Sequence, residues 1–304
     1  MPTKAGQIIG VPLDLGANMR GANMGPSAIR IADLHHKISV LGYQPYDSGD
    51  LPVPVRDTLP ASANEERYRT QIASACRNLE SEVHQALTLD RIPIVLGGDH
   101  SIAIGTIAGV SRFFREKNQN IGLIWIDAHA DCNTPQSSPS GNIHGMPLSI
   151  ALGHGYPDLV DIGGKGAKVK SENVALIGIR TLDGAEKDIL RRSGIRYFTM
   201  REIDERGMHA VMKDAVAVAS QGTAAIHLSF DIDGIDPASA PGVSTPVTGG
   251  ISYREAHLAL EMIADTGLLR SMEFVELNPM TDLAHKTAQL TVELVQSALG
   301  KAIV

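Results

Sequence analysis

Three potential metal ligands stand at alternate positions in one short stretch of the chain. Asp127, His129 and Asp131 are separated by single alanines in the sequence IWIDAHADCN, which begins at Ile124. In an extended chain, side chains two residues apart point to the same side. The stretch therefore presents a carboxylate, an imidazole and a second carboxylate to one cavity, where they could bind a cation.

Two other stretches carry the same residue types directly after apolar runs. Asp99 and His100 stand in GGDHS at 97–101, and Asp231 and Asp233 stand two apart in SFDIDG. A single Asp-x-His could be a solvated turn, because acidic residues are common in turns. Three strand ends of this kind do not fit that interpretation. Clustered carboxylates repel one another, and a bound cation is the usual remedy.

The charges of this cluster predict two ions. The aspartates at 127, 131, 231 and 233 carry four negative charges, which two divalent cations would balance. Carboxylates with imidazoles favour manganese or a similar ion, whereas a structural zinc site normally contains cysteine thiolates. Two such ions roughly 3.5–4 Å apart would convert a water between them into a nucleophile near neutral pH. The pattern thus predicts metal-assisted hydrolysis.

Hydrophobic periodicity outlines the elements that must position these residues. Apolar runs predict strands at 7–12, 92–97, 121–126, 174–179, 225–231 and 272–276. Helical spacing predicts helices from Pro26 to about Leu41, from near Ser62 to about Leu87, and over 288–299. Strands that alternate with helices predict an α/β fold with a mainly parallel sheet and helices on both faces. The active site is then expected at the carboxyl ends of the strands, where the motifs fall.

Composition limits the remaining possibilities. The chain has 304 residues, of which 43% are hydrophobic, and we expect one domain over 1–304. A net charge of −7 without a basic cluster argues against a nucleic-acid partner. Two cysteines, Cys76 and Cys132, fit a reducing cytosol, and both are expected to pack in the interior. We expect neither a signal peptide nor a membrane span, and hence a cytoplasmic protein.

Five motifs, in order, resemble those of the arginase family of ureohydrolases. They are GGDHS at 97–101, DAHAD at 127–131, SGNIHGMP at 140–147, SFDIDGIDP at 229–237 and ELNP at 276–279. The similarity also includes residues 11–30 and so extends over essentially the whole chain. It implies an arginase/deacetylase-like α/β/α fold of three layers with about eight strands, and a homotrimer or homohexamer. The implied reaction converts L-arginine and water to L-ornithine and urea, through attack of a metal-bridging hydroxide on the guanidinium carbon.

The resemblance also implies how each residue of the metal site acts. It implies two Mn(II) ions with six ligands, which are His100, Asp127, His129, Asp131, Asp231 and Asp233. Asp127 and Asp231 would bridge the ions. His100 and Asp131 would complete one position, and His129 and Asp233 the other.

Three residues are implied to act on the substrate. Asp131 would pass a proton to the departing nitrogen, as a general acid–base group does. His144 resembles the family's proton shuttle, a role that suits a group titrating near neutral pH. Glu276 would grip the guanidinium, a planar cation that a carboxylate holds well.

A polar loop bears on which guanidino compound is cleaved. By resemblance, the amino acid's carboxylate and ammonium are bound by Asn133, Ser138, Ser140, Asn142, Asp183 and Glu186, the last two at the ammonium. This favours arginine over agmatine, which has no carboxylate. The chain departs from the family at Thr181, where an acidic residue is common, and at Ser138 and Pro139, which replace a threonine-rich stretch.

Three alternatives remain at this stage. The first is another ureohydrolase, namely an agmatinase, a guanidinobutyrase or a formimidoylglutamase, which would differ in how the 133–142 loop reads a carboxylate. The second is a deacetylase of related fold with one zinc, against which His100 and Asp131 argue because they complete a second metal position. The third is a catalytically silent binding protein, against which the intact set of ligands argues.

Overall fold

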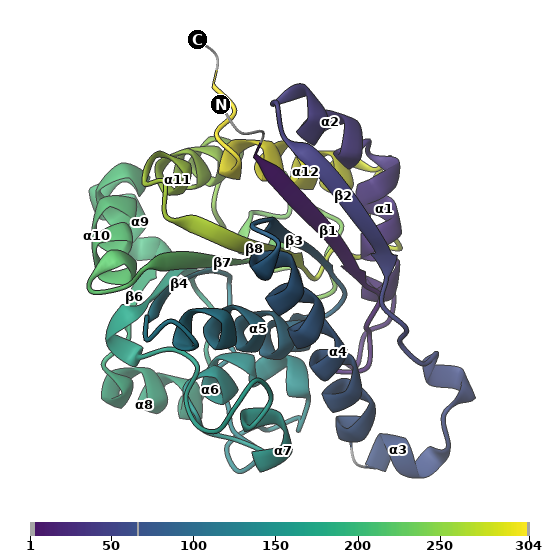
Figure 1. Ribbon diagram of the computed structural model, residues 1–304. Coiled ribbons are helices and arrows are strands. Elements are labelled where there is room, and N and C mark those ends of the chain that lie inside the picture. Colours follow the sequence, from purple (N-terminus) through teal and green to yellow (C-terminus); the bar gives the residue numbers. More distant parts are fainter. Residues whose placement is uncertain (1–3, 66, 303–304) are drawn as a thin grey trace.

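One sheet of eight strands runs through the middle of the computed structural model, which describes residues 4–65 and 67–302 (Figure 1). Every hydrogen-bonded pair of strands in it is parallel. The strands are β1 (Ala5–Val11), β2 (Gln44–Asp50), β3 (Ile92–Gly97), β4 (Ile121–Ile126), β5 (Val174–Ile179), β6 (Arg196–Thr199), β7 (Ala225–Asp231) and β8 (Leu269–Val275). Their order across the sheet is β2-β1-β3-β8-β7-β4-β5-β6.

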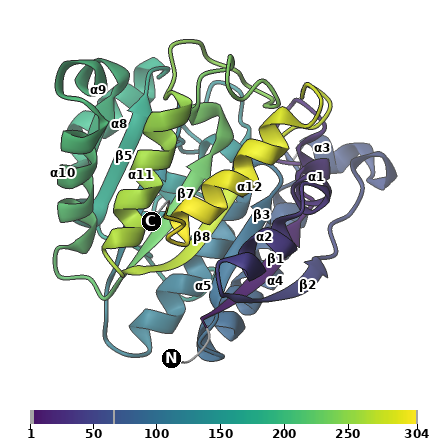
Figure 2. The same ribbon diagram turned by 90° about the horizontal axis from the view of Figure 1, so that it is seen from above.

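Consecutive side chains of a strand point into two different apolar cores. In β4, Ile124 and Ile126 belong to one core, and Leu123 and Trp125 belong to the other. A strand buried on both faces needs apolar residues at every position, which explains the continuous apolar runs. Helices therefore cover both faces, and the predicted α/β/α fold of three layers is confirmed (Figures 1 and 2).

The helices divide between the two faces. The first core is covered by α1 (Gly25–Ile31), α2 (Leu34–Val40), α9 (Met200–Arg206), α10 (Met208–Ser220), α11 (Tyr253–Asp265) and α12 (Lys286–Ala298). The second is covered by α4 (Arg69–Thr88), α5 (Ala103–Arg115), α6 (Pro147–Ala151), α7 (Pro157–Val160) and α8 (Gly184–Ser193), whereas α3 (Ala61–Glu65) precedes α4 at the periphery (Figure 1). No helix within residues 4–65 and 67–302 is long and apolar enough to cross a membrane.

Two predicted helices are each divided in the structure. Asp33, with φ 71°, separates α1 from α2, and Arg67 and Tyr68, with φ 51° and 52°, separate α3 from α4. Such left-handed backbone conformations end a helix, and they are uncommon for residues other than glycine. The prediction of two uninterrupted helices was therefore wrong, although the predicted apolar stripe of α4, including the free and buried Cys76, does face the core.

The four strands that carry acidic and imidazole motifs are neighbours in the sheet. They lie in the order β3, β8, β7, β4. Because all are parallel, their carboxyl ends lie on the same side of the molecule, where the following loops converge. The amino-terminal ends of the strands lie on the opposite side, together with the turns that lead into them, among them the exposed residues 115–120 at the end of α5 and before β4. The topology thus brings together groups that are far apart in the chain.

Candidate active site

His100 stands at the centre of a first group of ligands. It begins a 3₁₀ turn after β3, and its Nδ1 lies 3.2 Å from Asp127, 3.1 Å from Asp131 and 3.1 Å from Asp231. Its Nε2 lies 2.8 Å from the hydroxyl of Ser229, so the other nitrogen is directed at the carboxylates. One N–H can donate fully to only one of three such oxygens. Three carboxylate oxygens that all lie close to one ring nitrogen form the arrangement that a bound cation requires.

A second group shares one member with the first. His129 Nδ1 lies 3.4 Å from Asp127 and 3.2 Å from Asp233. The ligand atoms of Asp127, His129 and Asp233 lie within 4.8 Å of one another, as do those of His100, Asp127 and Asp231. Asp127 therefore belongs to both groups, which is the position of a bridging carboxylate.

The electrostatics of the cluster fit two divalent cations. Burial, reinforced by the charges of Asp233 and Asp127, raises the pKa of Asp231 well above its ordinary value. Burial and the charge of Asp127 likewise raise the pKa of Asp131. Carboxylates that repel each other in a buried site are stabilised when a cation lies between them. Four carboxylates and two imidazoles, without a thiolate among them, are donors suited to manganese-like ions.

Three residues that the motifs did not single out support the ligands. Trp125 Nε1 donates a 2.9 Å hydrogen bond to Asp127, and its ring stacks on His100 with 4.1 Å between ring centres. Thr245 donates a 2.8 Å hydrogen bond to Asp233, and Ser229 orients His100 as described. Trp125 lies in β4 and Ser229 in β7, and each precedes an aspartate ligand by two residues, so the alternation that identified the ligands could also have found them. No sequence signal marks Thr245.

Glu276 follows β8 directly and joins three chain segments. Its Oε1 accepts the backbone N–H of His100 at 2.9 Å and lies 3.0 Å from His144 Nδ1. Its Oε2 is buried without a hydrogen-bond partner among the described residues. The predicted strand 272–276 thus extends one residue too far at its end, because Glu276 adopts a left-handed conformation with φ 64°, and it begins three residues later than β8 does. Asp131, with φ 47°, turns in the same way.

The proximity of Glu276 decides the charge of His144. Burial alone would lower the pKa of His144, but the hydrogen bond and charge of Glu276 outweigh it and raise the pKa to about 9. The same pairing lowers the pKa of Glu276 although that carboxyl is buried. His144 is therefore protonated at neutral pH and available as a proton donor.

The predicted substrate-binding residues fall into two sets. Asn133 and Glu186 line the same cavity of about 180 Å³ as His144, Glu276 and four of the proposed ligands, which are His129, Asp131, Asp231 and Asp233. Asp183 lies behind Asn133 and accepts a 2.7 Å hydrogen bond from its amide, and it caps α8 together with Glu186. The other three, Ser138, Ser140 and Asn142, lie in the 137–142 loop but not on the lining of that cavity. Both serine hydroxyls accept backbone N–H groups within their own loop.

Thr181, at which the chain departs from the family pattern, and Cys132 do not line the cavity. Thr181 is exposed, and its backbone N–H donates to Ala128 O at 3.1 Å. Cys132 is free and buried, and burial raises the pKa of its thiol. Packing is therefore the role that the structure gives this cysteine, as expected.

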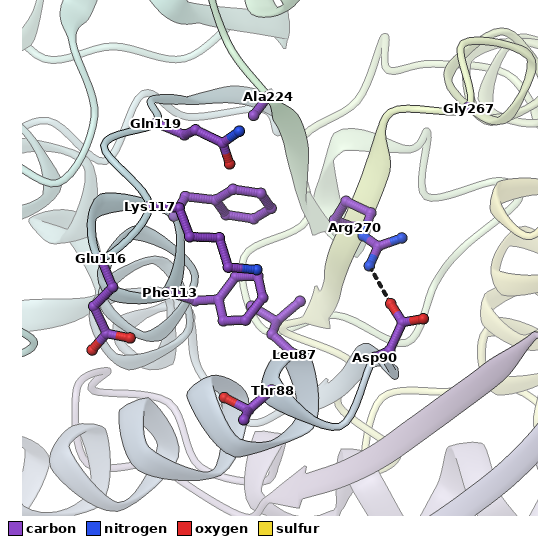
Figure 3. Close-up of a pocket in the computed structure, with 11 residues that line it drawn as sticks. Leu87, Thr88, Asp90, Phe113, Glu116, Lys117, Gln119, Ala224, Gly267 and Arg270 are labelled. Carbon is purple, nitrogen blue, oxygen red and sulfur yellow. Dashed lines mark hydrogen bonds and ion pairs between the residues drawn. The ribbon is translucent and has the colours of Figure 1, made fainter.

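A larger cavity, of about 700 Å³, lies at the amino-terminal ends of the strands, on the side opposite the ligands (Figure 3). It lies between the ends of α4 and α5 and the start of β8, and its cations are already engaged: Lys117 stands 3.6 Å over the ring of Phe113, and Arg270 lies 2.7 Å from Asp90. Its lining has no group of carboxylates and imidazoles comparable to the one described above. The chemistry of the protein therefore belongs to the smaller, polar cavity.

Comparison with known proteins gives one consistent result. A family model described as "Arginase family" matches residues 4–300. A protein named arginase from Bacillus caldovelox is 48% identical over 297 residues, covering 97% of this chain and 98% of its own, and one from Brevibacillus brevis is 49% identical over 293 residues, covering 96% and 97%. The native structure of the Bacillus caldovelox arginase superposes with a TM-score of 0.94 at 47% identity, covering 99% of this chain and all of that one.

Proposed function

The chain belongs to the arginase family, and from this premise we propose that it hydrolyses L-arginine with water to L-ornithine and urea at a site that holds two Mn(II) ions. The observation that carries the proposal is the position of Glu276. Glu276 lines the same cavity as members of both His/Asp groups, and its buried Oε2 has no hydrogen-bond partner among the described residues. The enzyme thereby presents a carboxylate for a cation beside a centre suited to hydrolysis.

The proposed ligands divide between two positions. His100 and Asp131 would hold one ion, His129 and Asp233 would hold the other, and Asp127 and Asp231 would be shared between them. The 3.1 Å approach of Asp131 to His100 and the sharing of Asp127 by both groups support this assignment. When bound, the two ions lower the pKa of a water between them and supply the nucleophile that attacks the guanidinium carbon.

The protein's own groups hold the substrate and move its protons. Glu276 accepts guanidinium N–H groups through Oε2, because Oε1 is already engaged by His100 and His144. Asp131 takes up the proton released in the attack and passes it to the departing nitrogen. His144, protonated at neutral pH, completes the protonation of the amine product.

The other end of the substrate meets the polar loop and the start of α8. Glu186 lines the cavity and is the proposed partner of the α-ammonium, with Asp183 behind it. Asn133 is the loop residue closest to the cavity for the α-carboxylate, and Ser138, Ser140 and Asn142 bind it directly or through water. Recognition of both charged groups is the reason to favour arginine over agmatine.

The setting of the enzyme is also a proposal. The sheet that spans Ala5 to Val275 supports one ureohydrolase domain over residues 1–304. Two buried free cysteines support a cytoplasmic location, where thiols stay reduced. The homotrimer or homohexamer rests on family membership, and light scattering of the purified protein measures it.

Urea release from the manganese-loaded protein tests the substrate. L-Arginine, agmatine and 4-guanidinobutyrate are compared at equal concentration, with the metal content of the same sample determined by atomic emission. We expect two Mn per chain and a strong preference for arginine. Preference for agmatine or guanidinobutyrate would keep the reaction class and refute the carboxylate-binding loop. Absence of urea with all three, at full metal content, would refute the proposed function.

A further inference from the structure

Arg180 makes an unusual set of contacts just outside the ligands. Among the described residues its guanidinium donates to main-chain carbonyls only. The short contacts are to Asp233 at 2.6 Å, Gly234 at 3.0 Å and Val247 at 2.7 and 3.2 Å, and longer ones go to Gly178 at 3.3 Å and Ile235 at 3.5 Å. The side chain of Arg180 is partly buried, and four aspartates lie near enough to favour its charge. Nevertheless, no carboxylate of the described residues forms an ion pair with it. The shortest of these hydrogen bonds go to carbonyls of two other chain segments, so Arg180 is placed to hold those segments together.

The backbone around Arg180 holds a second loop. Its own N–H and that of Thr181 donate to Ala128 O at 3.0 and 3.1 Å, and Ala128 lies between Asp127 and His129. The N–H of Asp127 in turn donates to Ile177 O at 3.0 Å. The segment after β5 is therefore hydrogen-bonded to the loop that carries Asp127 and His129, while its side chain reaches the loop that carries Asp233.

The hydrogen bonds from Arg180 to Val247 also affect the side chain of Asp233, through the segment that contains Thr245. Val247 lies two residues after Thr245, and Thr245 donates its hydroxyl to Asp233 Oδ2 at 2.8 Å. Arg180 thus fixes both the main chain of Asp233 and the segment that orients its side chain. Gly250 leaves room for this contact, because a Cβ there would lie 2.7 Å from Arg180 Nη2.

We infer that Arg180 is a positioning residue for one of the two metal positions, the one formed by Asp127, His129 and Asp233. It holds Asp233 against the other two ligands, and it sets the affinity of that position. The other position depends on His100, which comes from the end of β3 and has no hydrogen bond to Arg180. The inference rests on the proposed two-metal site. It adds Arg180 to the residues that determine metal binding, although Arg180 is not itself a ligand.

Arginine suits this task better than lysine. Its rigid guanidinium presents several donors at fixed angles, and it reaches Asp233, Gly234 and Val247 together, whereas an ammonium is a single point on a flexible stem. Residues that orient metal ligands typically contribute 10–100-fold to metal affinity. Arg180→Lys should therefore weaken one of two manganese-binding steps by about 10–100-fold and leave the other within about threefold. Arg180→Met should weaken the same step at least as much.

Calorimetric titration of the metal-free protein with Mn(II) provides the test, with circular dichroism and the unfolding midpoint as checks that each variant is folded. Lys168→Met is the matched control, because Lys168 Nζ also donates to three carbonyls, those of Val160, Gly164 and Gly166, each at 2.6 Å, but holds no ligand loop. Both of its manganese steps should match those of the wild type. A second comparison adds Arg180→Lys to His129→Asn, which lacks the affected position, and the remaining step should not change.

Three results would overturn the inference. Both steps could stay within threefold of the wild type in Arg180→Lys and Arg180→Met, both could weaken equally, or Arg180→Lys could weaken the step that remains in His129→Asn. A wild-type protein that binds fewer than two Mn per chain would instead refute the proposed site itself. The two failures are therefore distinguishable.

Discussion

His144 Nδ1 lies 3.0 Å from Glu276 Oε1, so the proposed proton shuttle and the proposed guanidinium-binding carboxylate are paired before any substrate arrives. The pairing engages Oε1 of Glu276 and leaves its Oε2 without a hydrogen-bond partner among the described residues. It also explains how a partly buried imidazole stays charged at neutral pH.

Replacing Glu276 by glutamine removes the charge but keeps the shape of the side chain. We expect Glu276→Gln to bind manganese as the wild type does and to lose at least about 100-fold in kcat/KM for arginine, because an unpaired buried cation costs several kcal/mol. Atomic emission and urea release measure the two properties. Unchanged turnover would exclude a role for Glu276 in holding the guanidinium.

The pairing should also appear in the pH dependence of stability. The pKa of His144 is raised from an ordinary 6.5 to about 9, so its stabilising effect is complete below pH 6.5 and is lost as pH rises through about 9. In the metal-free protein, His144→Asn should lower the unfolding midpoint by a few degrees more at about pH 6 than at about pH 9.5. Equal lowering at both values would mean that Glu276 does not charge this imidazole.

Glu186 should give arginine binding a different pH dependence. Burial, reinforced by Asp131, raises the pKa of Glu186 to about 7, and only the ionised form attracts the α-ammonium. The KM for L-arginine should therefore be about tenfold lower at pH 8 than at pH 6. Neither 4-guanidinobutyrate, which lacks that ammonium, nor Glu186→Gln with arginine should show the change. A shared dependence in all three would place its origin elsewhere.

The sharing of Asp127 predicts how metals are lost. Asp127 belongs to both ligand groups, whereas Asp233 belongs to one. Asp127→Ala should therefore bind no manganese after gel filtration, and Asp233→Ala should retain about one ion per chain. Asp236→Ala is the control, since Asp236 accepts backbone N–H groups of Ala238, Gly249 and Gly250 and is in neither group. Two ions per chain in Asp127→Ala would contradict its bridging position.

The sequence predicted the strands that are buried on both faces and failed at the edges of the sheet. β3, β4, β5 and β7 have the predicted bounds, because their positions are almost all apolar. β2, with the sequence QPYDSGD, and β6, with four residues, lie at the two edges, where one side needs no hydrogen-bonded neighbour and apolar patterning is weak.

The metal ligands could be anticipated because alternation on a strand is a local property. The contacts that Arg180 makes to the Asp233 and Val247 segments could not be anticipated. Those partners lie 53 to 67 residues further along the chain and are backbone carbonyls, which have no sequence signature. The helix break at Asp33 was equally hidden, because a left-handed conformation of a residue other than glycine depends on its tertiary surroundings.

The parallel sheet also places the active site and an exposed turn suitable for attachment at opposite ends of the protein. Every proposed catalytic group lies beyond the carboxyl ends of the strands, and the exposed turn at 115–120 lies at the opposite end of the six-residue β4, roughly 20 Å away. A dye, an affinity tag or a surface tether joined to that turn would leave the entrance of the cavity facing the solution.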